Sequence, residues 1–137
     1  MFKLSCALAL GLAAALAAPP GRAQPAGPDA SAFQRGPWAE LGELPDGAVL
    51  SISQTQYREG SVLTFALRTV FAEGDTGSTV EVIELHCAAA RFRRTSASAI
   101  KRNGEMSGSN EPGAYESYPQ ESVMGQLAGR LCGPEER

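Results

Sequence analysis

The sequence predicts an α+β domain: an antiparallel sheet of about five to six strands with one C-terminal helix tethered by a disulfide. Three observations predict it. Apolar residues alternate with polar ones in two long runs, 62–71 and 79–89, as they do in half-buried strands. Asn103-Gly104 is a strong hairpin signal between two further strand-like segments. After residue 122 the apolar period changes to that of a helix.

Residues 1–23 have the three-part pattern of a secretory signal peptide and are excluded from the fold. Lys3 supplies the positive end, residues 4–18 are almost entirely Ala and Leu, and small residues suit cleavage after Ala23 or after Ala17. A membrane anchor is the alternative. The apolar run is about 15 residues, shorter than the ~20 that a spanning helix needs. We therefore expect export, with no transmembrane anchor after cleavage.

Cleavage at residue 23 changes both the charge and the cysteine count. The chain of 137 residues has 12 Lys and Arg, 15 Asp and Glu, one His and three Cys, for a net charge of −3. The mature chain keeps 10 basic residues and two Cys, and its net charge is −5. This acidity argues against nucleic-acid binding, which normally requires a basic excess. We expect a flexible leader at 24–37, one domain at 38–133 and a tail at 134–137.

In the first half of the domain, the sequence predicts a buried aromatic residue, a turn and a hairpin. Trp38 is expected to bury its large ring in the core. Leu44-Pro45-Asp46-Gly47 is a turn signal, and residues 49–52 are apolar and β-branched enough for a short strand. Residues 58–61 then predict the hairpin connection that leads into the longest strand candidate, 62–71.

The strand predicted at 79–89 has two distinct faces. Ile83, Leu85 and Cys87 lie on one face, and Val80, Val82, Glu84, His86 and Ala88 lie on the other. We expect residues 91–94 to continue this strand, with a bulge or register change near Ala88-Ala89-Ala90.

The last element is a helix that is too weak to be stable alone. Its apolar residues recur at helical spacing between Val123 and Leu131, and Gly133-Pro134 is a stop signal. Gly125 and Gly129 each weaken it by roughly 1 kcal/mol relative to Ala. The helix therefore needs support from the rest of the fold.

The two mature cysteines, Cys87 and Cys132, predict one disulfide, because an even pair in an exported protein is normally oxidised. Two free thiols are the alternative. Cys87 is in phase with the apolar face of its strand and Cys132 ends the helix, so the bond would pin the helix to the sheet. In the chain-entropy model, closing a loop of this length stabilises the fold by ~4 kcal/mol.

A series of short motifs follows a characteristic order along residues 38–133. It consists of Trp38-Ala39-Glu40-Leu41-Gly42, Pro45-Asp46-Gly47, a hairpin around Gly60, Glu84-Leu85-His86-Cys87, Arg91-Phe92-Arg93-Arg94, and the closing residues Tyr115, Pro119, Ser122, Leu127 and Cys132. In this order and spacing the motifs resemble the surface-adhesin protein E family of small exported proteins from Gram-negative bacteria. The resemblance implies an antiparallel sheet domain, a Cys87–Cys132 disulfide, and adhesion to host extracellular-matrix or serum proteins.

The sequence offers little for catalysis, and we expect no enzyme activity, no cofactor and no metal site. His86 is the only His, and with Glu84 it would need at least one more ligand to hold a metal ion. A Ser–His–acid triad would have to use His86, and no Gly-x-Ser-x-Gly elbow is present. An exposed surface pair is the simpler interpretation of Glu84 and His86.

The strongest candidate for partner binding is a group of basic residues. Half of the mature basic residues fall within 12 positions: Arg91, Arg93, Arg94, Lys101 and Arg102. Such a patch can bind acidic proteins, glycosaminoglycans or anionic lipid headgroups. Alternatively, the arginines cover apolar neighbours and pair with Glu81 or Glu105.

Together these features predict a non-enzymatic, adhesin-like protein of the periplasm or outer cell surface. It would recognise a protein or polyanionic partner, with a host matrix protein among the partners. The alternative is a periplasmic structural or accessory subunit that associates through a sheet edge, for example as a homodimer.

Overall fold

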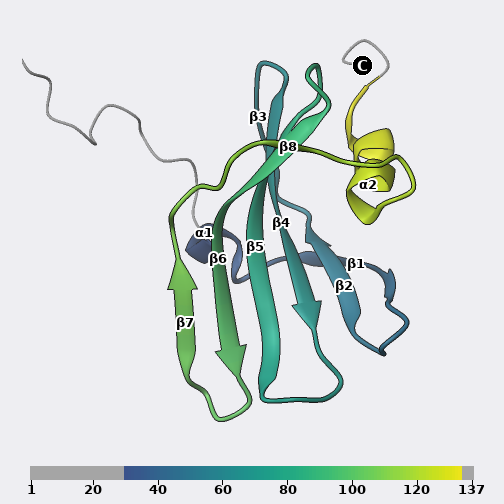
Figure 1. Ribbon diagram of the computed structural model, residues 1–137. Helices are drawn as coiled ribbons and strands as arrows, with labels where there is room; N and C mark the ends of the chain where they lie inside the picture. Colours follow the sequence, from purple (N-terminus) through teal and green to yellow (C-terminus); the bar gives the residue numbers. More distant parts are fainter. Residues whose placement is uncertain (1–29, 134–137) are drawn as a thin grey trace, which may run out of the picture.

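An eight-stranded antiparallel sheet occupies most of residues 30–133, the part of the chain that the computed structural model describes (Figure 1). In chain order the elements are α1 (Ala30–Phe33), β1 (Trp38–Glu43), β2 (Val49–Ser53), β3 (Tyr57–Glu59), β4 (Val62–Val70), β5 (Thr76–His86), β6 (Arg91–Lys101), β7 (Met106–Ser109), β8 (Glu116–Ser117) and α2 (Val123–Leu131). Six strands follow the order β1-β2-β4-β5-β6-β7, while β3 pairs with β4 and β8 pairs with β6. The predicted fold class is confirmed. The predicted signal peptide and the C-terminal tail lie outside the described residues.

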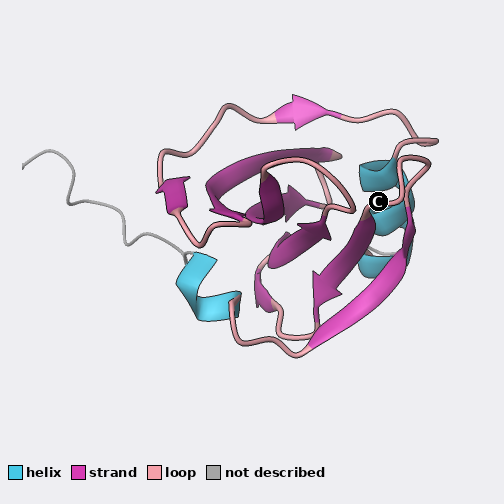
Figure 2. Ribbon diagram, turned by 90° about the horizontal axis from the view of Figure 1, so that it is seen from below, coloured by secondary structure: helices cyan, strands magenta, loops and turns pink. Residues whose placement is uncertain are grey.

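Each helix packs on a different face of the sheet, and Figure 2 shows how strongly the sheet curves between them. The α2 face carries the larger core cluster: Ile52, Leu63, Phe65, Ile83, Leu85, Cys87, Met124, Leu127, Ala128 and Cys132. The α1 face carries a smaller one, formed by Phe33, Ala66, Val80 and Val82, with Trp38 packed against it. The predicted division of the fifth strand into two faces is therefore confirmed, and Glu84 and His86 follow Val82 onto the α1 face.

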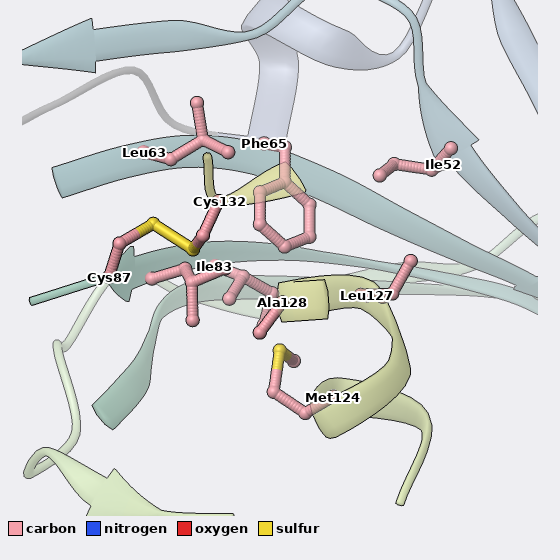
Figure 3. Close-up of a cluster of buried hydrophobic side chains, with 10 residues drawn as sticks. Ile52, Leu63, Phe65, Ile83, Cys87, Met124, Leu127, Ala128 and Cys132 are labelled. Carbon is pink, nitrogen blue, oxygen red and sulfur yellow. A yellow bond between two sulfur atoms is a disulfide. The ribbon is translucent and has the colours of Figure 1, made fainter. Parts of the chain in front are cut away.

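The disulfide joins Cys87, directly after β5, to Cys132, the C-cap of α2. Both sulfurs lie within the core of the α2 face, where Leu63 and Ile83 are close to them (Figure 3). Met124 and Leu127 hold the rest of the helix against the sheet. The bond therefore fixes the C-terminal end of a helix that its two glycines weaken.

The residues after β5 form a tight turn and do not continue the strand, which corrects the expectation for residues 91–94. The Ala90 N–H donates to the Cys87 carbonyl at 3.3 Å, and Ala90 has a φ of 53°. The chain then returns as β6, antiparallel to β5. The register change lies farther along, between Val82 and Ile83 of β5, where Thr95 is the extra residue of β6. No Gly marks the turn, although Ala90 adopts the left-handed conformation that Gly favours.

Residues 30–37, which the sequence assigned to a flexible leader, belong to the folded domain. Phe33 is 1% exposed and meets the ring of Tyr57 edge-on, with 5.8 Å between ring centroids. Its burial over the α1 face gives the segment a fixed position in spite of its Pro, Ala and Gly content. The domain described here therefore begins at α1, eight residues before Trp38.

Replacing Gly129 with Ala should raise the free energy of unfolding by up to about 1 kcal/mol. A Cβ at this position meets no atom within 4 Å, and Ala is the better helix former. Gly125→Ala is the matched control and should destabilise the protein, because its Cβ would collide with the carbonyl oxygens of Pro119 and Gln120. Urea denaturation of residues 24–137 measures both changes. Equal effects at the two glycines would contradict the position of α2 against this turn.

Candidate functional site

A polar cluster lies on the α1 face where β5 and β6 meet at their connecting turn. Its members are Glu84, His86, Arg91, Arg93 and Tyr115. Antiparallel pairing sets Glu84 opposite Arg93 and His86 opposite Arg91. Tyr115 comes from the segment before β8, whose Glu116 pairs with Phe92 of β6. Residues from two strands and one loop therefore meet through sheet register.

Arg93, Glu84 and Tyr115 hold one another in place. Arg93 Nε donates to Glu84 Oε1 at 2.6 Å, and the Tyr115 hydroxyl donates to the same oxygen at 3.2 Å. The guanidinium lies over the Tyr115 ring, 4.7 Å from its centroid. The side chains of Arg93 and Glu84 are only 29% and 18% exposed, so solvent screens this pair less than it would screen a fully exposed one.

The two titratable partners of Glu84 have shifted pKa values. The hydrogen bond to Glu84 raises the pKa of Arg93 above its ordinary value, and this outweighs the opposing effect of burial. Burial raises the pKa of Tyr115, and the negative charge of Glu84 raises it further. Both shifts keep Arg93 and Tyr115 protonated, the states in which each donates to Glu84.

His86 is held by a different set of bonds. Its Nδ1 accepts from the Ala89 N–H at 3.3 Å and lies 3.3 Å from the Ser61 hydroxyl. The neutral ring therefore carries its proton on Nε2. The imidazole and the Tyr115 ring are nearly perpendicular, with 6.4 Å between their centroids. The sequence pattern missed Ser61, because its contact with His86 depends on the register of β4 against β5.

The Ser61–His86 pair differs from a catalytic dyad. A backbone N–H already occupies the His86 nitrogen that faces Ser61. The nearest acid along the strand is Glu84, which accepts hydrogen bonds from Arg93 and Tyr115. No hydrogen bond between Glu84 and the His86 imidazole is found in the described residues, whereas the acid of a catalytic triad orients its histidine. Within residues 30–133, no three His, Cys, Asp or Glu side chains gather in a way that could hold a metal ion.

The structure separates the five basic residues proposed from the sequence. Arg91 and Arg93 lie in the polar cluster, whereas Arg94 lies on the α2 face. Lys101 and Arg102 lie at the other end of β6, some 30 Å away for ten residues of strand. The five therefore do not form one continuous patch.

Four of these five cations are bonded within the fold. Arg93 pairs with Glu84 as described, Arg94 pairs with Glu81 at 2.8 Å, and Lys101 pairs with Glu105 at 3.2 Å. Arg102 donates to the carbonyls of Phe71 and Gly74. Arg91 is exposed, and its side chain makes no bond with any residue in the described part of the chain. Of the proposed set, Arg91 is thus the cation available to a partner.

Two hollows flank α2, and the second reaches Ala88 and Ala90 of the turn between β5 and β6. A groove of about 150 Å³ separates the helix from β1 and β2, with Leu41, Leu50 and Val123 among its walls. A pocket of about 350 Å³ lies beside the disulfide and is lined by Cys87, Ala88, Ala90, Tyr118, Gln120, Gly125, Ala128, Gly129 and Cys132. No charged side chain lines this pocket, and Tyr118 and Gln120 carry the polar groups of its lining.

Comparison of the chain with known protein families, characterised proteins and solved structures finds no match. The similarity to the surface-adhesin protein E family thus remains an expectation that rests on the order of the motifs. None of the helices in residues 30–133 has the length and apolar character needed to cross a membrane.

The phenol of Tyr115 should titrate above its ordinary pKa of 10.0 in the folded protein. Its contribution to stability is therefore present below pH 10 and is lost as the pH rises through the folded pKa, because the unfolded chain releases the proton first. Ultraviolet difference titration measures this pKa, and Tyr115→Phe identifies the signal. Glu84→Gln should lower the pKa by removing the neighbouring charge. An unchanged pKa in the Glu84→Gln protein would contradict the cluster described here.

Proposed function

We propose that this chain is a non-enzymatic, exported, adhesin-like binding protein whose partner contacts the polar cluster. The observation that carries the proposal is the position of Arg91. It is an exposed cation on a rigid strand, and the side chains beside it are already fixed by one another. A partner that pairs with Arg91 would meet a surface that needs little further ordering, which lowers the cost of binding.

The surroundings of Arg91 favour a protein partner over a long polyanion. A polyanion is held by several free cations in line, and the two nearby arginines, Arg93 and Arg94, are used in internal ion pairs, Arg94 on the other face. Arg91 instead lies opposite His86, whose ring contacts that of Tyr115. One arginine with aromatic neighbours resembles the small energetic centre of many protein interfaces.

The bonding of His86 and the residues at the N-terminus support the rest of the proposal. His86 Nδ1 is occupied by a backbone donor, which argues against a role as a general base toward Ser61. The signal-like pattern of residues 1–23 supports export to the periplasm or the outer cell surface.

Arg91→Glu should weaken partner binding at least about tenfold, because it reverses the one free charge of the cluster. Immobilised extracellular-matrix proteins serve as protein ligands and heparin as the polyanion, each tested with residues 24–137 at low and high salt. Lys101→Glu is the matched control at the far end of β6 and should leave binding unchanged. Binding that is insensitive both to salt and to Arg91→Glu would overturn the role of this surface.

A second candidate function, association through a sheet edge, is favoured by β7. This strand ends the sheet, all four of its residues are exposed, and Met106 is 61% exposed. It contains neither a charged residue nor Pro, the usual features that block edge pairing. A second copy of the chain could add its own β7 to this edge and form a homodimer.

Met106→Lys should convert such a dimer to a monomer, because a charge on the exposed edge opposes strand addition. Light scattering on residues 24–137 over a range of concentrations measures the mass. Val123→Lys changes an equally apolar exposed position on α2, away from this edge, and should leave the dimer intact. A wild-type protein that stays monomeric at high concentration would exclude this second function.

A further inference from the structure

Arg68 and Trp38 meet on the α1 face, at a distance from the polar cluster. Arg68 of β4 lies between Ser51 of β2 and Val80 of β5, and Trp38 of β1 lies opposite Ser53. The guanidinium carbon of Arg68 is 4.8 Å from the centre of the indole ring. Because the two serines beneath are small and buried, both large side chains can lie flat against the sheet.

Both side chains hold a buried N–H group with no acceptor. Arg68 Nε and Trp38 Nε1 are inaccessible to solvent and have no hydrogen-bond partner among the described residues. In that same part of the chain no carboxylate lies within ion-pair distance of Arg68, whereas Arg93 and Arg94 each have one. Buried donors are almost always paired in folded proteins, so two adjacent exceptions call for an acceptor from outside.

We propose that Arg68 and Trp38 form a binding site for the carboxylate group of a small organic acid. A carboxylate has two acceptor oxygens, which match the parallel N–H groups along the Nε edge of an arginine. The indole N–H of Trp38 is a further neutral donor without an acceptor. The ring shields one side of the guanidinium from water, which strengthens its attraction for an anion. Both residues are half-buried as a whole, whereas their two unpaired N–H groups are inaccessible, so a carboxylate would reach these groups only after the two side chains shift.

Glu40 is the charged neighbour that opposes a bound carboxylate. It is exposed on β1, opposite Ser51, and therefore lies in the same row of the sheet as Arg68. Its charge would repel an anionic ligand, so Glu40→Gln should tighten binding by about twofold or more. This sign distinguishes ligand binding from a general effect on stability.

Fluorescence provides a direct test, because Trp38 is the only tryptophan in the chain. Residues 24–137 are titrated with sodium acetate, inorganic phosphate and sodium chloride at constant ionic strength. We expect a saturable change of emission with acetate that chloride does not produce. Arg68→Gln should weaken acetate binding at least about tenfold. Arg94→Gln, which removes an ion-paired arginine on the other face, should leave it unchanged.

Further variants distinguish carboxylate binding at Arg68 from a loss of folding or a simple effect of charge. Arg68→Lys retains the charge without the parallel N–H edge, so it should fold and still bind acetate more weakly than the wild type. Thermal unfolding checks that each variant is folded, and calorimetry repeats the titration without relying on fluorescence. A response that does not saturate, equal binding by Arg68→Lys, or tighter binding of phosphate would overturn the carboxylate site. Arg91→Glu should bind acetate as the wild type does. The test of the carboxylate site is therefore independent of the test of the proposed function.

Discussion

The register of β5 between its two neighbours is the constraint on which the rest of the structure depends. Buried residues on both sides fix it: Phe65 opposite Ile83 on the α2 face, and Ala66 opposite Val82 on the α1 face. A slip of one residue would exchange the faces and bury Glu84 in the core. The same register places Glu84 beside Arg93, and it brings Cys87 to the end of α2. Core packing, the disulfide and the polar cluster are thus consequences of one alignment of strands.

Much of this arrangement is predictable from local patterns. Alternation in β4 and β5, the Asn103-Gly104 turn and the helical spacing after Ser122 each depend on neighbouring residues, and the structure confirms them. The β5–β6 turn was missed because three alanines carry no turn signal, although Ala90 has a positive φ. The burial of Phe33 was also missed, since it depends on Val80 and Val82, far away in sequence. Local sequence thus predicts elements well, and predicts poorly the contacts that attach one segment to another.

Prediction of the candidate site from the sequence was limited in the same way, because the arrangement of charges also depends on contacts between strands. Clustering in sequence predicted one basic patch, but strand geometry sends Arg93 and Arg94 to opposite faces and carries Lys101 to the far end of β6. The alternative drawn from the sequence, pairing with Glu81 or Glu105, is confirmed at Arg94 and Lys101, whereas the Arg93–Glu84 pair was missed because it depends on the register of β5 against β6. Density of charge along a chain is therefore a weak guide to free charge on a surface.

The distinction between bonded and unbonded cations carries the functional argument. Carboxylates outnumber basic groups by five in residues 24–137, so a typical cation there has acidic groups available for pairing. A cation without an acidic partner is therefore a candidate binding residue, and the candidate is stronger where the neighbouring side chains are held in place. Among the described residues, Arg91 has no bonded partner at the edge of the polar cluster, and Arg68 has none while it stacks on the half-buried ring of Trp38. An exposed cation can satisfy itself with water, whereas a buried Nε–H cannot, so the need for an outside acceptor is stronger at Arg68. The two proposals thus differ in kind: Arg91 is proposed to contact a partner's surface, and Arg68 is proposed to bind an anion.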